Sequence, residues 1–138
     1  MPVEEAVLGI RVPIERDPDI VAARQSGREL AARIGFKGSE LTLIATAISE
    51  IARNIVSYAK RGEILFQPAR RGATAGIEII ASDRGPGIAD IELAMRDGYS
   101  TARSLGLGLP GARRLMDDFD IVSTVGEGTT VTMRKWLR

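Results

Sequence analysis

The sequence contains no cysteine and no histidine. The absence of cysteine excludes thiolate nucleophiles, thiol redox switching and cysteine-based metal sites. The absence of histidine removes the commonest general base and the Ser-His-Asp arrangement, and it means that the chain cannot phosphorylate itself on histidine. Any chemistry must therefore use Asp, Glu, Asn, Lys, Arg and backbone dipoles, with a hard metal ion such as Mg²⁺ where one is needed.

The chain also has little that would direct it to nucleic acid or to a membrane. It has one Trp, two Tyr and three Phe, a formal net charge of +1 and no basic block, so a nucleic-acid partner is not expected. No apolar run approaches the roughly 20 residues that cross a bilayer, and the acidic residues 1–5 do not resemble a signal peptide. We therefore expect a cytoplasmic protein with no membrane partner.

The length and the hydrophobic pattern predict one domain over residues 1–138, because 138 residues that are 44% apolar can bury a core. Strands are expected at residues 7–14, 63–67, 74–82, 120–125 and 129–136, and helices at 18–34, 39–60, 88–95 and 106–118. Asp17 should cap the first helix, and Gly62 lies just past the end of the second. The strand at 74–82 is nearly continuous in apolar residues, which favours a central position.

This order of elements argues against a Rossmann or P-loop sheet, because the strands do not alternate with the helices. The predicted fold class is α+β. We expect a two-layer α/β sandwich, with the helices on one face of a mixed, mostly antiparallel sheet.

The second predicted helix carries two polar residues beside its apolar side. Glu50 and Asn54 are four residues apart and therefore stack on one face. At about 100° per residue, that face lies at the margin of the apolar stripe, which is formed by Ile44, Ile48, Ile51 and Ile55. A half-shielded carboxylate can act as a base, and an amide oxygen can bind Mg²⁺. The alternative is a solvated polar face.

Two glycine-rich segments follow. Asp83 comes at the end of an apolar strand, and Gly85 and Gly87 come directly after it. An Asp in this place can accept a hydrogen bond from an exocyclic amine, while glycines let the backbone approach a planar base. A plain turn is the alternative.

The second glycine-rich segment is Gly-Leu-Gly-Leu at residues 106–109, directly before a predicted helix. Successive N–H groups and the helix dipole make such a segment suitable for binding phosphates. A flexible helix entry is the alternative there.

A fourth segment, Gly128-Thr129-Thr130, opens the last strand, where the hydroxyl of Thr129 could support Asp83 at the base. Each segment alone is weak evidence. Together, and in this order, they provide an acid/base carboxylate, a metal-binding amide, a base-reading carboxylate and a phosphate site. They predict an ATP site.

These motifs resemble, across nearly the whole chain, the ATPase domain shared by gyrase, Hsp90, histidine kinases and MutL, the GHKL or Bergerat fold. Glu50 and Asn54 match its N box. Its glycine boxes are matched by Asp83, Gly85 and Gly87, by Gly106 and Gly108, and by Gly128-Thr129. Small size and a short segment between the first two glycine boxes single out the serine-kinase branch. Within it, residues 104–117 and the ending Arg134-Lys135-Trp136 are similar to the RsbT-type switch kinases of the stressosome.

The resemblance implies a role for each matching residue. Glu50 would be the general base for an acceptor serine, Asn54 would hold Mg²⁺, and Asp83 would read the adenine amino group with support from Thr129. The backbone of Gly106, Leu107, Gly108 and Leu109 would bind the phosphates of ATP, and Gly85 and Gly87 would lie against the base.

It also implies partners. RsbT-type kinases phosphorylate serine or threonine on STAS-domain scaffold proteins and, once released, activate a serine phosphatase in sigma-factor regulation. Two alternatives stay open: an anti-sigma factor kinase that binds a sigma factor, and a non-catalytic module that activates a phosphatase when ATP binds.

Overall fold

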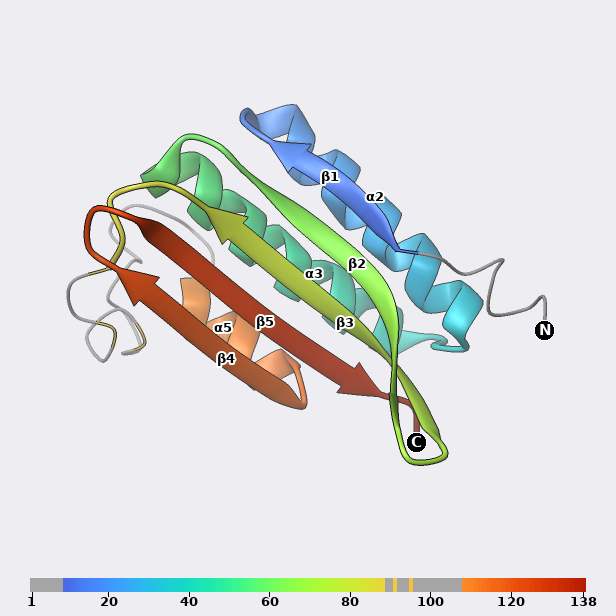
Figure 1. The fold of residues 1–138 in the computed structure, drawn as a ribbon. Helices are drawn as coiled ribbons and strands as arrows, with labels where there is room; N and C mark the ends of the chain where they lie inside the picture. Colours follow the sequence, from blue (N-terminus) through green and yellow to red (C-terminus); the bar gives the residue numbers. More distant parts are fainter. Residues whose placement is uncertain (1–8, 89–90, 92–94, 96–107) are drawn as a thin grey trace.

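The computed structural model describes residues 9–88, 91, 95 and 108–138 (Figure 1). Strand β1 (Ile10–Ile14) leads into helices α2 (Asp17–Ile34) and α3 (Ser39–Asn54), and α3 continues into a π-helical turn, η1 (Ile55–Ala59). Strands β2 (Gly62–Arg71) and β3 (Thr74–Asp83) follow. Helix α5 (Gly108–Leu115) then precedes strands β4 (Asp118–Thr124) and β5 (Gly128–Trp136).

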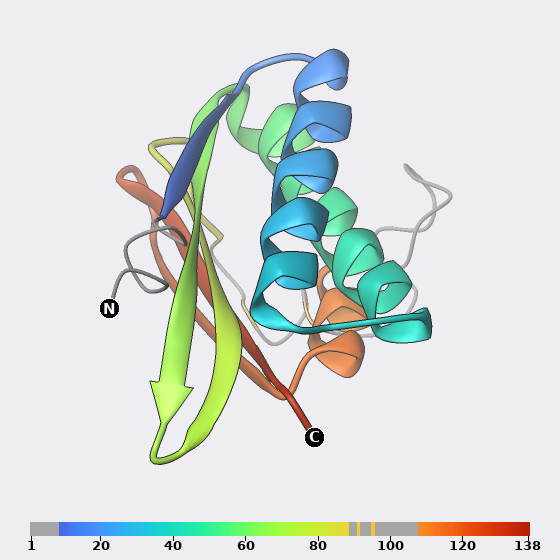
Figure 2. The same cartoon turned by 90° about the vertical axis from the view of Figure 1, so that its right-hand side faces the viewer.

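The five strands form one sheet in the order β1-β2-β3-β5-β4. All four pairings between these strands are antiparallel, so the described part of the chain has no parallel pairing of the kind that a mixed sheet contains. The helices lie on one face of the sheet (Figure 2). The predicted two-layer α+β fold is confirmed, and so is the central position of β3.

The core lies between the sheet and the helices because each strand turns alternate residues toward the helices. Phe66, Ile79 and Met133 occupy paired positions on β2, β3 and β5, and all three are fully buried. From the helical side, α3 and the first residue of η1 contribute the predicted apolar stripe of Ile44, Ile48, Ile51 and Ile55, each at most 2% exposed.

The first two helices lie within one residue of their predicted bounds, but the residues at their ends do not act as predicted. Helix α2 begins at Asp17 itself, and the carboxylate of Asp19 accepts the backbone N–H groups of Glu15 and Arg16. The residue that ends the second helix is Lys60, with φ of 75°, whose N–H bonds to the carbonyl of Ile55. Gly62 instead begins β2, because the chain has already turned at Lys60.

Parts of two predicted helices fall outside the described residues. Of the helix expected at 88–95, only residues 88, 91 and 95 are described, and the helix expected at 106–118 is described from Gly108 and ends at Leu115. Among the helices described, none is both long enough and apolar enough to span a bilayer.

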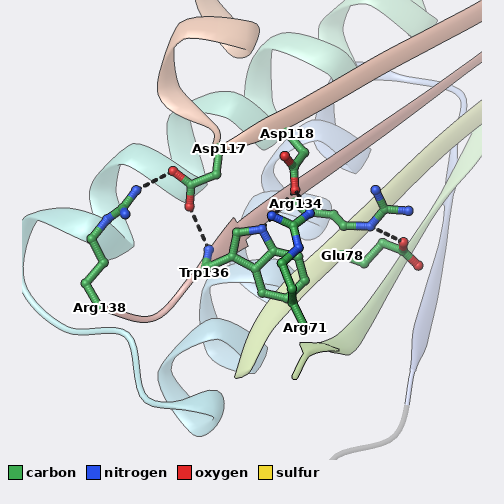
Figure 3. A network of polar contacts seen from close by, with 7 residues as sticks. All are labelled: Arg71, Glu78, Asp117, Asp118, Arg134, Trp136 and Arg138. Carbon is green, nitrogen blue, oxygen red and sulfur yellow. Dashed lines mark hydrogen bonds and ion pairs between the residues drawn. The ribbon is translucent and has the colours of Figure 1, made fainter. Parts of the chain in front are cut away.

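A polar network joins the segment after α5 to the last strand (Figure 3). Asp117 accepts the backbone N–H of Trp136, and Asp118 accepts its indole Nε1–H, both at 2.8 Å. The Arg71 guanidinium bonds to Asp118 at 2.6 Å and lies 4.4 Å from the centroid of the Trp136 ring. The network therefore holds the carboxyl end of α5 against β5.

The negative charge of Asp118 stabilises this contact between the end of α5 and β5. The hydrogen bond from Trp136 lowers the pKa of the Asp118 carboxyl below its ordinary value; desolvation opposes that shift, and Arg71 adds to it. A carboxyl whose pKa is lower in the folded state stabilises the fold above its unfolded-state pKa. That stability is lost as the pH falls through the folded-state pKa.

We predict that Asp118→Asn lowers the free energy of unfolding by about 1 kcal/mol at pH 7, because solvent screening at this partly exposed site reduces the worth of a hydrogen bond with a charged partner. The deficit should persist at pH 5 and shrink as the pH falls below about 3.9, the ordinary pKa of Asp, because the unfolded chain then begins to bind the proton and the wild-type carboxyl loses its advantage. Urea denaturation at pH 7, 5 and 3 measures this. Asp120→Asn, at an exposed position on the same strand, is the matched control. A deficit that is unchanged at pH 3 would contradict the role given to the charge.

Candidate active site

Asp83 joins two of the predicted motifs. It ends β3, and its Oδ1 accepts the backbone N–H of Gly85 at 2.8 Å and that of Thr129 at 3.3 Å. Within the described part of the chain, Oδ2 has no hydrogen-bond partner. One oxygen of the carboxylate is thus held by the backbone, and the other is available to a donor on a ligand.

The glycines around Asp83 are required by close backbone contacts. A Cβ on Gly85 would lie 2.6 Å from the Cβ of Ala59, and one on Gly128, where φ is +129°, would lie 2.1 Å from the carbonyl oxygen of Asp83. Gly87, with φ of +80°, belongs to the same loop. The first glycine box therefore packs against η1 and against the start of β5, which brings it beside the end of the N-box helix.

Ser123 is a site residue that the sequence analysis missed. Its hydroxyl lies 2.7 Å from the backbone N of Ile88, 2.7 Å from the hydroxyl of Thr129 and 3.2 Å from the carbonyl oxygen of Gly128. A serine in a strand has no distinctive local pattern. Its position opposite Thr129 in the β4–β5 register was the only signal available, and that required the hairpin to be aligned first.

Glu50 lies deeper than the half-shielded position predicted for it, with only 8% of its surface exposed. Its Oε1 accepts the backbone N–H of Gly108 at 3.0 Å, and its Oε2 accepts Nη1 of Arg53 at 3.2 Å. The structure therefore brings the predicted base to the first residue of α5. Arg53, for which the sequence suggested no role, is its ion-pair partner.

The second glycine box is described from Gly108, and Gly106 and Leu107 lie outside the described residues. Gly108 begins α5 with φ of +68°. Its N–H, predicted to bind phosphate, is bonded to Glu50 in this structure. The side chain of Leu109 belongs to the hydrophobic core, so only its backbone could face a ligand.

Asn54 ends α3 and is followed directly by η1. Single π-helical turns inside helices are frequent at functional sites. Asn54 is half-buried, and its side-chain amide has no hydrogen-bond partner within the described residues. Within the same residues, no group of three or more Asp or Glu side chains could hold a metal ion.

A cavity of about 410 Å³ opens at the end of the sheet that carries Asp83. Its lining consists of Glu15, Ala59, Arg61, Gly62, Glu63, Ser82, Asp83 and Arg84. Of the predicted site residues that the structure describes, only Asp83 lines it. The cavity therefore does not bring the predicted site residues together, and Glu50 and Gly108 meet elsewhere, between α3 and α5.

Comparison with known proteins shows which family the chain belongs to. A model of the histidine kinase-like ATPase domain matches residues 14–135. The chain is 50% identical over 127 residues to the serine/threonine-protein kinase RsbT of Bacillus subtilis (strain 168), covering 92% of this chain and 96% of that protein. It is 33% identical over 121 residues, 83% of each chain, to the anti-sigma F factor of Thermoanaerobacter sp. (strain X514).

A solved structure is similar as well. The crystal structure of the RsbU and RsbW domains of Rv1364c from Mycobacterium tuberculosis matches with a TM-score of 0.59 and 25% identity over 92% of this chain. The present chain spans only 31% of that longer one. The resemblance seen in the sequence motifs is confirmed: the chain belongs to the family of histidine kinase-like ATPase domains.

Proposed function

We propose that this chain is a protein serine/threonine kinase that uses ATP and Mg²⁺ and acts in the regulation of a sigma factor. The observation that carries the proposal is the meeting of a buried carboxylate, Glu50, with the amino-terminal N–H of α5 at Gly108. A candidate base thereby adjoins a candidate phosphate site. The 50% identity to a protein named as a serine/threonine kinase supports the same conclusion.

Adenine would be read at Asp83. The free Oδ2 can accept a hydrogen bond from the exocyclic amine, while Oδ1 stays on the backbone N–H groups of Gly85 and Thr129. Because both backbone contacts hold the carboxylate in one orientation, the oxygen offered to the base needs little reorganisation on binding. Gly85 and Gly87 would let the backbone approach the ring.

The phosphates would lie at the amino-terminal end of α5, on the backbone of Gly106, Leu107, Gly108 and Leu109. A helix N-terminus favours anions because its first N–H groups are unpaired and its dipole is positive there. In the described structure Glu50 is the anion that accepts the Gly108 N–H. When that N–H turns to a phosphate oxygen, Glu50 loses one of its two partners and becomes available to the acceptor hydroxyl.

Magnesium would be held by Asn54 through its amide oxygen. The lack of a cluster of three carboxylates in the described part of the chain fits this ion, because Mg²⁺ commonly takes one or two protein ligands and completes its shell with phosphate oxygens and water. When bound, it would neutralise charge on the phosphates.

Glu50 would act as the general base. Its carboxylate would accept the hydroxyl proton of a serine or threonine as the oxygen attacks, a step that demands positioning rather than a covalent intermediate. Arg53 would remain as the ion-pair partner of Glu50. This chemistry suits a chain without cysteine or histidine.

The proposed substrates are STAS-domain scaffold proteins, and the proposed partner after release is a serine phosphatase, in the cytoplasm where sigma factors act. An anti-sigma kinase that binds a sigma factor directly is the second candidate, favoured by the 33% identity to an anti-sigma F factor. The third is a module that activates the phosphatase on binding ATP, without phosphoryl transfer.

We predict that Glu50→Gln largely abolishes phosphoryl transfer, by at least about a hundredfold, while nucleotide affinity changes little. Glutamine keeps the shape and an oxygen for Gly108, but it cannot take up a proton. Single-turnover transfer and calorimetric ATP binding separate the two effects. The control is Glu40→Gln in the first turn of the same helix. Transfer at the wild-type rate in Glu50→Gln would exclude Glu50 as the base and favour the module that only binds ATP.

We predict that Asp83→Asn weakens ATP binding by about tenfold to a hundredfold, the range expected for one hydrogen bond with a charged partner. Asparagine can keep its oxygen on the two backbone N–H groups, but it then presents an NH₂ group to the adenine amine. Isothermal titration calorimetry measures the change, with Asp120→Asn as the control. Unchanged affinity in Asp83→Asn would show that the base is read elsewhere.

The substrate class is tested by transfer of labelled phosphate from Mg²⁺-ATP to a panel of STAS-domain proteins, with pull-down of a sigma factor in parallel. We expect labelling of at least one STAS protein that depends on Glu50. Capture of the sigma factor without labelling of any STAS protein would favour the anti-sigma alternative.

A further inference from the structure

Arg53 is the one cation that pairs with the proposed base in the described part of the chain. Its Nη1 lies 3.2 Å from Oε2 of Glu50, which stands three residues earlier on α3. The side chain of Glu50 is 9% exposed and that of Arg53 is 41% exposed. The guanidinium therefore connects a buried carboxylate to the solvent-exposed side of the helix.

The two oxygens of Glu50 are held by different kinds of donor. Oε1 accepts a neutral backbone N–H from another helix, that of Gly108 at 3.0 Å, whereas Oε2 accepts the charged Arg53 of its own helix. In the proposed function the N–H of Gly108 passes to a phosphate oxygen. Arg53 is then the partner that Glu50 keeps among the described residues, so the orientation of the carboxylate during transfer depends on it.

A buried base needs such a partner for two reasons. Burial disfavours the charged form of a carboxyl group, and a cation offsets this effect more than a neutral donor does. A general base must also direct a lone pair toward the proton that it takes. Residues three apart are neighbours on a helix surface. The contact between Arg53 and Glu50 therefore does not depend on the position of α5.

We propose that Arg53 is a positioning residue for phosphoryl transfer, which holds Glu50 as an oriented carboxylate while ATP occupies the N–H groups of α5. The inference rests on the proposed function, because it assumes that Glu50 is the base. Arg53 acts through Glu50 in this account and contacts neither the nucleotide nor the acceptor hydroxyl.

The test measures single-turnover transfer of labelled phosphate from Mg²⁺-ATP to the STAS-domain protein that the unaltered chain labels fastest. Arg53→Met keeps a long apolar side chain but removes the charge and the donor, and it should slow transfer about tenfold, the factor expected for one charged hydrogen bond. The affinity for ATP, measured by calorimetry, should stay within about twofold. Arg53→Lys keeps a cation beside Glu50 and should recover most of the rate.

A double-mutant cycle makes the test specific to Glu50. In the Glu50→Gln background no carboxylate remains to be held, so Arg53→Met should slow the residual transfer by less than about twofold. The control is Arg33→Met, which removes an exposed arginine from the last turn of α2, the same place in the helix that Arg53 has in α3. It should leave the rate unchanged.

Several results would overturn the inference and leave Glu50 as the base. One is transfer at the wild-type rate in Arg53→Met. Another is a tenfold loss in both backgrounds, because Arg53 would then act independently of Glu50. Weakened ATP binding in Arg53→Met would indicate a structural role instead. If Glu50→Gln leaves no measurable transfer, the lysine variant decides, and a loss equal to that of Arg53→Met would overturn the inference.

Failure of the proposed function would look different. The unaltered chain would then label no STAS-domain protein, or Glu50→Gln would transfer phosphate at the wild-type rate. Either result would overturn the role of Glu50 itself and the role of Arg53 with it.

Discussion

The hydrogen bonds at the end of β3 position most of the candidate site. Strand β3 is paired on both sides, with β2 and β5; its last residue, Asp83, pairs with Gly62 of β2, one residue beyond the end of the β3–β5 pairing. The two bonds accepted by its Oδ1 then place the first glycine box and the start of β5 around one carboxylate.

A second contact joins the two helices at the proposed catalytic end of the site. The bond from Gly108 to Glu50 connects α3 with α5, and it satisfies a helix N-terminus with a buried carboxylate. In this geometry the buried Glu50 carboxylate is not left without partners, because Arg53 and Gly108 each bond to one of its oxygens.

Much of the architecture could be predicted because its signals are local. The apolar stripe of α3 and the near-continuous apolar run of β3 follow from periodicity, and both lie where periodicity places them. The end of the N-box helix near Lys60 could be predicted as well, but the residue that turns the chain there could not. A lysine with positive φ at Lys60 has no sequence signature, whereas Gly62 has a strong one that here serves the start of a strand. Close packing at that corner decided between them.

The sequence by itself determined which residue types stand in which order, and with them the family, the core faces and the candidate residues from Glu50 to Thr129. Only the tertiary structure decided which of these meet. Gly108 and Glu50 are 58 residues apart, and Ile88 and Ser123 are 35 apart. Such contacts depend on helix packing and on the register of the β4–β5 hairpin. No local pattern encodes them, because hydrophobic periodicity specifies the face of an element and leaves open its position along its neighbour.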